Sequence, residues 1–235
     1  MTDGLYVGMT AATARAQQLE AVADNLANAQ TPGFKATTPT FETYMVGDGS
    51  SQAPYVVASS TNVDRREGTT VISGNPLDVV PEGDLFLAVS MPGGQRGFTR
   101  AGRLSVDASG MLSAAGHPLL GASGGPILVP PGAAPTIREN GEVVVAGSVV
   151  DSISLFKLEG ELQRVGPSLL LPQGKAVPQG ETRLRVGELE MGNGNMLDAA
   201  VQLVAVQRHF DNAIQAIQTY RKMDSQAVEL GRVRG

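Results

Sequence analysis

The sequence predicts a mainly β protein with long terminal α-helices, in which an all-β central domain is inserted between N- and C-terminal helices that pair as a coiled coil. Three patterns lead to this fold class. Apolar residues recur in alternating steps of three and four at both ends of the chain, as in helices that pack on a partner helix. Between the ends the apolar period is two. In that middle region, turn residues recur about every eight to twelve residues.

The composition indicates a chain rich in turns. Its 235 residues include 29 glycines and 14 prolines, whereas aromatic residues make up only 4%. The net charge is −5 and the lysines and arginines are not clustered. Nucleic acid is therefore not expected as a partner, because binding to phosphates needs clustered cations. The absence of cysteine excludes disulfides and thiolate catalysis.

The first helix is expected from Gly4 to about Asn28. Alanine, a strong helix former, fills many of its positions. The segment Thr31-Pro32-Gly33 ends it, because proline cannot continue a helix and glycine tolerates left-handed backbone. A helix of roughly 25 residues spans about 37 Å. Its apolar seam consists of Leu5, Met9, Ala12, Ala16, Leu19, Val22 or Ala23, and Leu26.

Residues 35–77 are predicted to form an extended connector between the first helix and the β domain. The segment is polar and rich in Thr, Ser and Gly. Short β-prone pieces at Tyr55–Val57 and Thr69–Ile72 are expected as isolated strands, with mobility around 47–52.

Residues 78–189 are predicted to form the all-β domain. Glu139-Asn140-Gly141 is a strong hairpin signal, because Asn and Gly accept positive φ. The expected strands are Leu77–Val80, Leu85–Val89, Gly97–Arg100, Arg103–Val106, Met111–Ser113, Pro126–Val129, Thr136–Arg138, Val143–Val145, Ser152–Lys157, Leu169–Leu171 and Thr182–Val186.

The second helix is expected above all from Asn195 to Arg221. Segments 1–34 and 190–235 together are predicted to form a terminal helical domain, whose helices pack on each other in one chain or between subunits. The seam of the second helix consists of Met196, Ala199, Leu203, Val206, Phe210, Ala213, Ile217 and Tyr220.

Residues able to support catalysis are few, so an enzyme, a cofactor and a metal site are not expected. His117 and His209 have no second His or Cys at metal-ligand spacing, and are interpreted as a turn residue and a helix-surface or interface residue. Ser123-Gly124-Gly125 lacks a hydrolase elbow. The acidic residues Asp78, Glu82 and Asp84 lack calcium-loop spacing. The segment 192–195 lacks the lysine of a phosphate loop and is interpreted as a turn followed by a helix N-cap.

The motif Asn25 to Lys35 is the most specific feature outside the seams. Asn25 and Asn28 share one helical face just before the break. Their amides could cap free carbonyls at the end of the helix or form hydrogen bonds between subunits, and both interpretations use the same geometry.

Several motifs resemble the bacterial flagellar rod and hook axial family. The segment Asn25 to Lys35 is similar to the N-terminal motif of that family, Asn-x-Ala-Asn-x-x-Thr-x-Gly-Phe-Lys. The resemblance continues through nearly the whole chain in the right order. It is carried further by Gly74–Asp78, Glu82–Phe86, Phe98–Leu104, Gly110–Leu112, Gly116–Leu119, Gly194–Met196, Gln207–Phe210 and Ile217–Thr219.

The resemblance implies a structural subunit of the flagellar basal-body rod. Its terminal helices would form the inner, D0-like layer of a helical tube that transmits torque across the periplasm, and its β domain a D1-like outer layer. The partners would be copies of itself, other rod proteins and the flagellar type III export apparatus, with no small-molecule substrate. The assembly interface would comprise Leu5, Met9, Ala12, Ala16, Leu19, Asn25, Leu26, Asn28, Gly33, Phe34, Leu203, Val206, Gln207, Phe210, Ile217 and Tyr220.

The N-terminal residues lack the basic and apolar regions of a secretory signal, and no apolar run is long enough to span a bilayer. We therefore expect a soluble chain that is exported without a cleaved signal peptide. Its length suits a proximal-rod member better, with a distal-rod member as the near alternative. A third interpretation is a binding module, in which the β domain holds a ligand and the helices only dimerise it.

Overall fold

The computed structural model describes residues 2–46, 53–130 and 132–233. The chain divides into two compact units. The helical unit comprises Met1–Leu26, Thr37–Asn62 and Asn195–Gly235, and the β unit comprises Ala27–Ala36 and Val63–Gly194. Segment 27–36 thus belongs to the β unit. Most of the connector expected at residues 35–77 belongs to the helical unit. The mobility expected around 47–52 lies outside the described residues.

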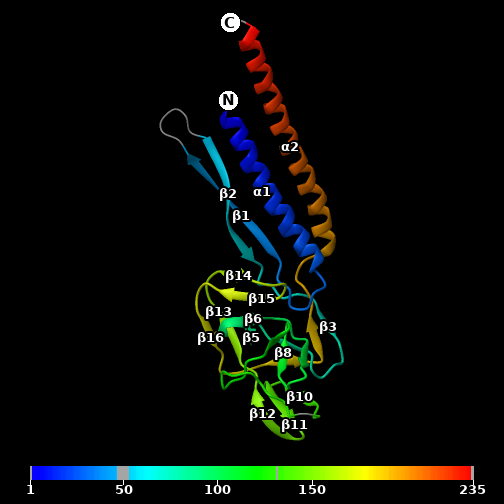
Figure 1. Ribbon diagram of the computed structural model, residues 1–235. Helices are drawn as coiled ribbons and strands as arrows, with labels where there is room; N and C mark the ends of the chain where they lie inside the picture. The colour runs from blue at the N-terminus through cyan, green and yellow to red at the C-terminus, as the bar shows by residue number, and fades with distance from the viewer. Residues whose placement is uncertain (1, 47–52, 131, 234–235) are drawn as a thin grey trace. The chain divides into compact units, whose positions relative to one another are not determined.

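Both predicted helices are present. Helix α1 runs from Thr2 to Ala27, and α2 runs from Met196 to Val233, beyond the expected end near Arg221. The two helices lie side by side in the helical unit (Figure 1). A Cβ atom on Gly8 would lie only 2.9 Å from Cγ1 of Ile217, so the missing side chain permits this close approach. Coiled-coil geometry between the helices stays a prediction.

The polar segment after α1 forms two long strands. Strands β1 (Thr37–Val46) and β2 (Ala53–Val63) pair with each other in a two-stranded sheet. The expectation of an extended connector with isolated strands is corrected here, because each strand finds its partner in the other. Thr and Val residues in both strands favour this structure, since β-branched side chains fit a pleated surface.

The β unit contains many short strands, as predicted. They are β3 (Thr70–Ile72), β4 (Val79–Pro81), β5 (Phe86–Ser90), β6 (Arg96–Thr99), β7 (Leu104–Val106), β8 (Leu112–Ala114), β9 (His117–Pro118), β10 (Pro135–Ile137), β11 (Glu142–Val145), β12 (Ser148–Ser152), β13 (Leu155–Leu158), β14 (Leu162–Arg164), β15 (Leu169–Pro172), β16 (Ala176–Pro178), β17 (Leu184–Val186) and β18 (Glu188–Glu190). A short 3-10 turn, η1 (Pro92–Gly94), joins β5 to β6.

The largest sheet has the strand order β14-β15-β6-β5-β13-β16, and its neighbours are antiparallel. Smaller sheets are formed by β10-β11-β12, β7-β8-β9, β17-β4 and β18-β3. The hairpin predicted at Asn140-Gly141 is confirmed: β10 and β11 pair antiparallel, and Gly141 has a φ of +85°.

Two strand predictions are corrected. Residues 126–129 make only isolated bridges, Leu120 with Pro126 and Met111 with Leu128. The expected strand Ser152–Lys157 is divided between β12 and β13, which belong to different sheets. Both segments are apolar enough to suggest continuous strands, but each pairs with more than one neighbouring segment along its length, so its pairing is interrupted.

The core of the β unit lies on both faces of β5. Phe86 and Ala88 pack in a cluster with Phe98 and Phe156, whereas Leu87 and Val89 pack in a second cluster. The rings of Phe98 and Phe156 meet edge to face, with centroids 5.6 Å apart. Since successive side chains of a strand point to opposite faces, one unbroken apolar run supplies both clusters. In the described part of the chain, neither helix combines the length and apolarity needed to cross a membrane.

We predict that Gly102→Ala strongly destabilises the β unit. A Cβ atom at this position would lie 1.5 Å from the carbonyl oxygen of Val79, which is backbone and cannot rotate away. The expected loss in the free energy of unfolding is about 4 kcal/mol or more, measured by chemical denaturation. Gly180→Ala is the control, because the added carbon meets no atom within 4 Å. Equal stability of the two variants would contradict the close approach.

Candidate functional site

The predicted seam of α2 is partly buried by other residues of the same chain. Ala199 and Val206 are buried, and Leu203, Phe210 and Ile217 are half-buried. Other predicted interface residues of α2, Gln207 and Tyr220, are exposed.

The predicted seam of α1 is less uniform. Ala12 is buried, Leu19 and Leu26 are half-buried, and Met9 and Ala16 are exposed. The side chain of Leu5 lies outside the described part of the chain. Ala14, which does not belong to the seam, is also buried. Because residues 12 and 14 point to different sides of a helix, α1 is packed on more than one side.

A second apolar stripe on α2 was missed by sequence analysis. Leu197, Val201 and Val204 are 72%, 65% and 53% exposed. Their spacing of four and three residues places them on one face of the helix, outside the seam. The heptad pattern in the sequence marks only the seam. Whether these three residues are exposed depends on what surrounds the helix. We call these three residues the exposed stripe.

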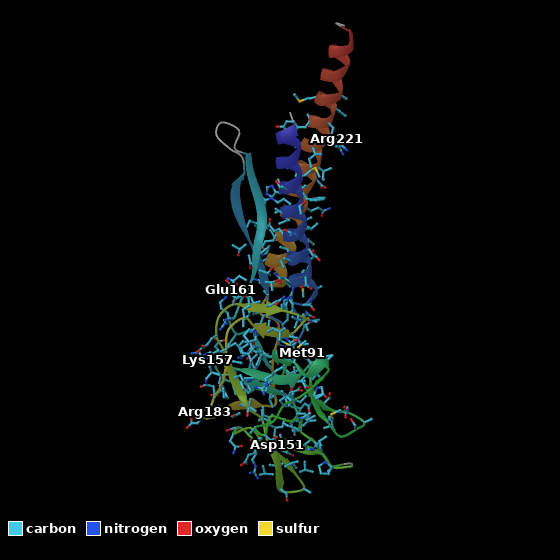
Figure 2. All side chains as sticks on the ribbon, turned by 60° about the vertical axis from the view of Figure 1, so that its left-hand side comes forward. Met91, Asp151, Lys157, Glu161, Arg183 and Arg221 are labelled. Carbon is cyan, nitrogen blue, oxygen red and sulfur yellow. The ribbon has the colours of Figure 1, made fainter. Side chains whose placement is uncertain are left out.

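Farther along α2, Tyr220 and Met223 expose 50% and 57% of their surface. They flank Arg221, which Figure 2 shows on the C-terminal part of α2. Apolar residues that a soluble chain leaves exposed along one face are typical of surfaces that bind protein partners.

The start of α2 has the predicted N-cap. The side-chain oxygen of Asn195 accepts hydrogen bonds from the backbone N–H groups of Leu197, at 3.0 Å, and Asp198, at 3.4 Å. The carboxylate of Asp198 in the first turn also suits the positive end of the helix dipole. Segment 192–195 is thus a turn followed by a cap.

Asn25 joins the end of α1 to the start of β1. Its side-chain NH₂ group donates to the carbonyl oxygen of Thr37 at 2.8 Å, and its side-chain oxygen accepts from the N–H of Thr37 at 2.9 Å. Asn28 accepts from Thr31 through its backbone carbonyl at 2.9 Å and through its side-chain oxygen at 3.2 Å. Both motif amides therefore form bonds within this chain.

Gly33 and Phe34 are buried inside the β unit. Gly33 has a φ of +68°, and a Cβ atom there would lie 2.1 Å from the backbone nitrogen of Ala101. Phe34 is fully buried, and the guanidinium of Arg164 lies 4.9 Å from its ring centroid. These contacts give both residues a packing role within the chain.

Beside them lies a buried ion cluster of Lys35, Arg100 and Glu190. The Lys35 ammonium is 2.8 Å from one Glu190 carboxylate oxygen, and Nε of Arg100 is 2.6 Å from the other. All three side chains are 1% exposed. The backbone N–H of Gly68 also donates to Glu190, at 3.0 Å.

Backbone carbonyls share the remaining donors of the two cations. Arg100 donates to the carbonyl oxygens of Pro81, Gly83 and Leu85, and Lys35 donates to that of Arg66. The partly exposed Glu67 approaches Arg100 at 3.7 Å. A buried charge is tolerated only when such partners compensate for lost water.

The cluster changes the pKa values of Glu190 and Lys35. Burial alone would raise the pKa of the Glu190 carboxyl, but the charge of Arg100 and the hydrogen bond from Lys35 outweigh burial and lower that pKa below its usual value. Burial lowers the pKa of the Lys35 ammonium, against the opposing effect of its bond to Glu190. Glu190 is therefore ionised in the folded chain at neutral pH.

Asn193 ties together three segments of the β unit. Its side-chain oxygen accepts from the N–H of Ala36 at 2.7 Å, and its NH₂ group donates to the carbonyls of Asp64 and Arg66 at 2.9 and 3.0 Å. From the sequence, Asn193 was expected only as part of a turn, and Arg100 only as the end of a strand and part of a motif. No local pattern marks either residue as a bridge.

The described residues contain no group of three His, Cys, Asp or Glu that could hold a metal ion. His117 is half-buried in β9 and His209 is exposed on α2. An open groove of the β unit is lined by residues that include Glu82, Glu139 and Arg183. The exposed stripe of α2 offers apolar surface for binding.

Two family models match parts of the chain. The model described as flagella basal body rod protein matches residues 5–35, which include most of α1 and the motif up to Lys35. The model described as flagellar hook protein FlgE/F/G D1 domain matches residues 82–145.

Curated relatives match most of the chain. Flagellar basal-body rod protein FlgF of Mesorhizobium japonicum is 32% identical over 97% of this chain and 98% of its own length. FlgF of Escherichia coli is 33% identical over 92% of this chain and 93% of its own length. Flagellar basal-body rod protein FlgG of Borreliella burgdorferi is 26% identical over 95% of this chain and 96% of its own length.

We predict that Asn25→Ala loosens the helical unit. The substitution leaves the N–H and C=O of the buried Thr37 without their side-chain partner. A loss of about 2 kcal/mol in the free energy of unfolding is expected, followed by the helical circular dichroism signal in denaturant. Asn62→Ala at an exposed position of β2 is the control, and an equal effect there would refute the role of Asn25.

We also predict that Glu190→Gln destabilises the β unit by about 3–5 kcal/mol at neutral pH, because it leaves two buried cations without their anion. Since the folded-state pKa of Glu190 is lowered, its contribution is present above the ordinary value of 4.5 and is lost as pH falls through the folded-state pKa. The difference in unfolding free energy between wild type and variant should therefore shrink in acid.

Glu188→Gln is the matched control for this measurement. Glu188 is half-buried and lies 3.5 Å from Arg185, so its loss should cost less than about 1 kcal/mol. A difference between wild type and Glu190→Gln that stays constant from neutral to acidic pH would exclude Glu190 as the titrating group.

Proposed function

Because this chain belongs to the family of flagellar basal-body rod proteins FlgF, we propose that it is a structural subunit of the rod that assembles through its terminal helices into a helical tube and transmits torque across the periplasm. The observation that carries the assembly step is the exposed stripe of α2. Leu197, Val201 and Val204 leave apolar surface exposed along one face of that helix.

The energetics favour burial of this stripe by protein. Removing apolar surface from water contributes about 25 cal/mol per Å², so each of the three side chains gains on the order of 1–2 kcal/mol when it is covered. The gain is repeated in every subunit of an assembly. Contacts between different faces of identical subunits that do not close into a ring generate a helical tube.

The seam residues and the exposed stripe have separate roles in this proposal. Leu203, Phe210 and Ile217 are already half-buried within one chain, and Gly8 lets Ile217 approach α1. They hold the helices of one subunit together and contact neighbours with their remaining exposed surface. Met9, Ala16, Gln207 and Tyr220 are exposed and contribute to the interface between subunits.

The partners in this proposal are copies of the same chain, other axial proteins of the rod, and the flagellar type III apparatus that exports the chain. A proximal position in the rod is supported by the FlgF relatives, which are 32% and 33% identical, against 26% for the FlgG relative. The FlgG relative also matches along nearly its whole length, so a distal position is the second candidate.

We predict that Val201→Glu blocks incorporation into the rod while the purified chain stays folded. Val201 is 65% exposed in the subunit, so the charge is harmless there, but burial against a neighbour would leave it unpaired at a cost of several kcal/mol. Incorporation into isolated basal bodies and swimming of cells that depend on this chain are the measurements. The circular dichroism and denaturation curve of the purified variant should match wild type.

Gln202→Glu adds the same charge at the next exposed residue, outside the exposed stripe, and should assemble normally. Charged substitutions at Leu203, Phe210 or Ile217 should also block assembly, although they disturb packing within the subunit as well. Wild-type swimming of cells with Val201→Glu would overturn the proposal for this surface.

A further inference from the structure

The chain passes between its two units at four places, after Leu26, Ala36, Asn62 and Gly194. On the β-unit side, the residues next to these crossings bind one another. Asp64 donates its N–H to the carbonyl of Ala36 at 2.8 Å, and Asn193 bonds to Ala36 and Asp64. A Cβ atom on Gly192 would lie 2.6 Å from the carbonyl oxygen of Ala29, so these backbones are also in contact.

The ion cluster lies in the same segments. Lys35 precedes the second crossing by one residue, and Glu190 belongs to β18, shortly before the fourth. The backbone carbonyl of Glu190 accepts from the N–H of Gly33 at 2.8 Å, while its side chain accepts from Lys35. One residue thus holds the segment that follows α1 through both its backbone and its charge.

The charges make separate opening of these segments costly. If the segment around Glu190 left alone, Lys35 and Arg100 would stay buried without their anion. If both segments left together, the two opposite charges of Lys35 and Glu190 would reach water at once. Arg100 would then keep the carbonyls of Pro81, Gly83 and Leu85 and the nearby Glu67.

We propose that the ion cluster is a latch: segments 27–36 and 187–194, which lead into α1 and α2, detach from the β unit only together, in one opening event. The latch thus couples two segments that are far apart in sequence, one next to each terminal helix. Neither helix loses its attachment to the β unit while the other keeps its own. This property of the single chain does not depend on the proposed rod function.

Hydrogen exchange of the full-length chain, followed by mass spectrometry, tests the latch. Lys35→Met and Glu190→Gln change opposite ends of the chain. In a single cooperative opening, each substitution should accelerate exchange in both 33–36 and 191–193, by the same factor of about 100 or more. Exchange in the core strands β5 and β6 should stay slower than in these two segments, because those strands open only with the whole unit. The exposed Lys175→Met and the half-buried Glu188→Gln are the matched controls.

The latch is overturned if each variant accelerates exchange only in its own segment, or if neither accelerates it. Should Glu190→Gln unfold the whole unit, Glu190→Asp and Lys35→Arg keep the charges while they change the reach of the side chains. Equal protection of these segments and of β5 and β6 in the wild-type chain would also overturn it, since the segments would then open only with the entire unit.

Discussion

A carboxylate removed from water is costly unless opposite charges and hydrogen bonds compensate for the lost solvation. Glu190 meets both conditions, with Lys35 at 2.8 Å and Arg100 at 2.6 Å. These residues come from the segment after α1, the core of the β unit and the segment before α2, so both ion pairs form only when all three are in place. In the proposed latch, the attachment of segments 27–36 and 187–194 to the β unit depends on this interaction.

The helical unit follows the opposite principle. It leaves Leu197, Val201 and Val204 exposed, and its two helices approach each other closely where Gly8 of α1 meets Ile217 of α2. The β unit is complete within one chain, whereas helix α2 exposes apolar surface. In the proposed rod subunit, the β unit is the fixed body and α2 carries the surface that a neighbouring subunit covers.

Local features could be predicted from sequence because their causes lie within a few residues. The period of three and four marked α1 and α2, Asn195 marked the start of α2, and Asn140-Gly141 marked a hairpin. The pairing of β1 with β2 was missed, because a Thr-rich polar segment has the same composition whether its strands pair or stay apart. Burial of Phe34 was missed for a similar reason: its motif suggested an interface and did not show which surface covers the ring.

The sequence by itself determined the order of helix, strands and helix, and the family to which its motifs point, because periodicity and turn chemistry are properties of neighbouring residues. Only the tertiary structure decided that Lys35 and Arg100 meet Glu190, from which they are separated by 155 and 90 positions. It also decided which apolar face of α2 stays exposed. Both depend on the packing of segments far apart in the chain, and no local pattern records which distant residue fills the space beside a given side chain.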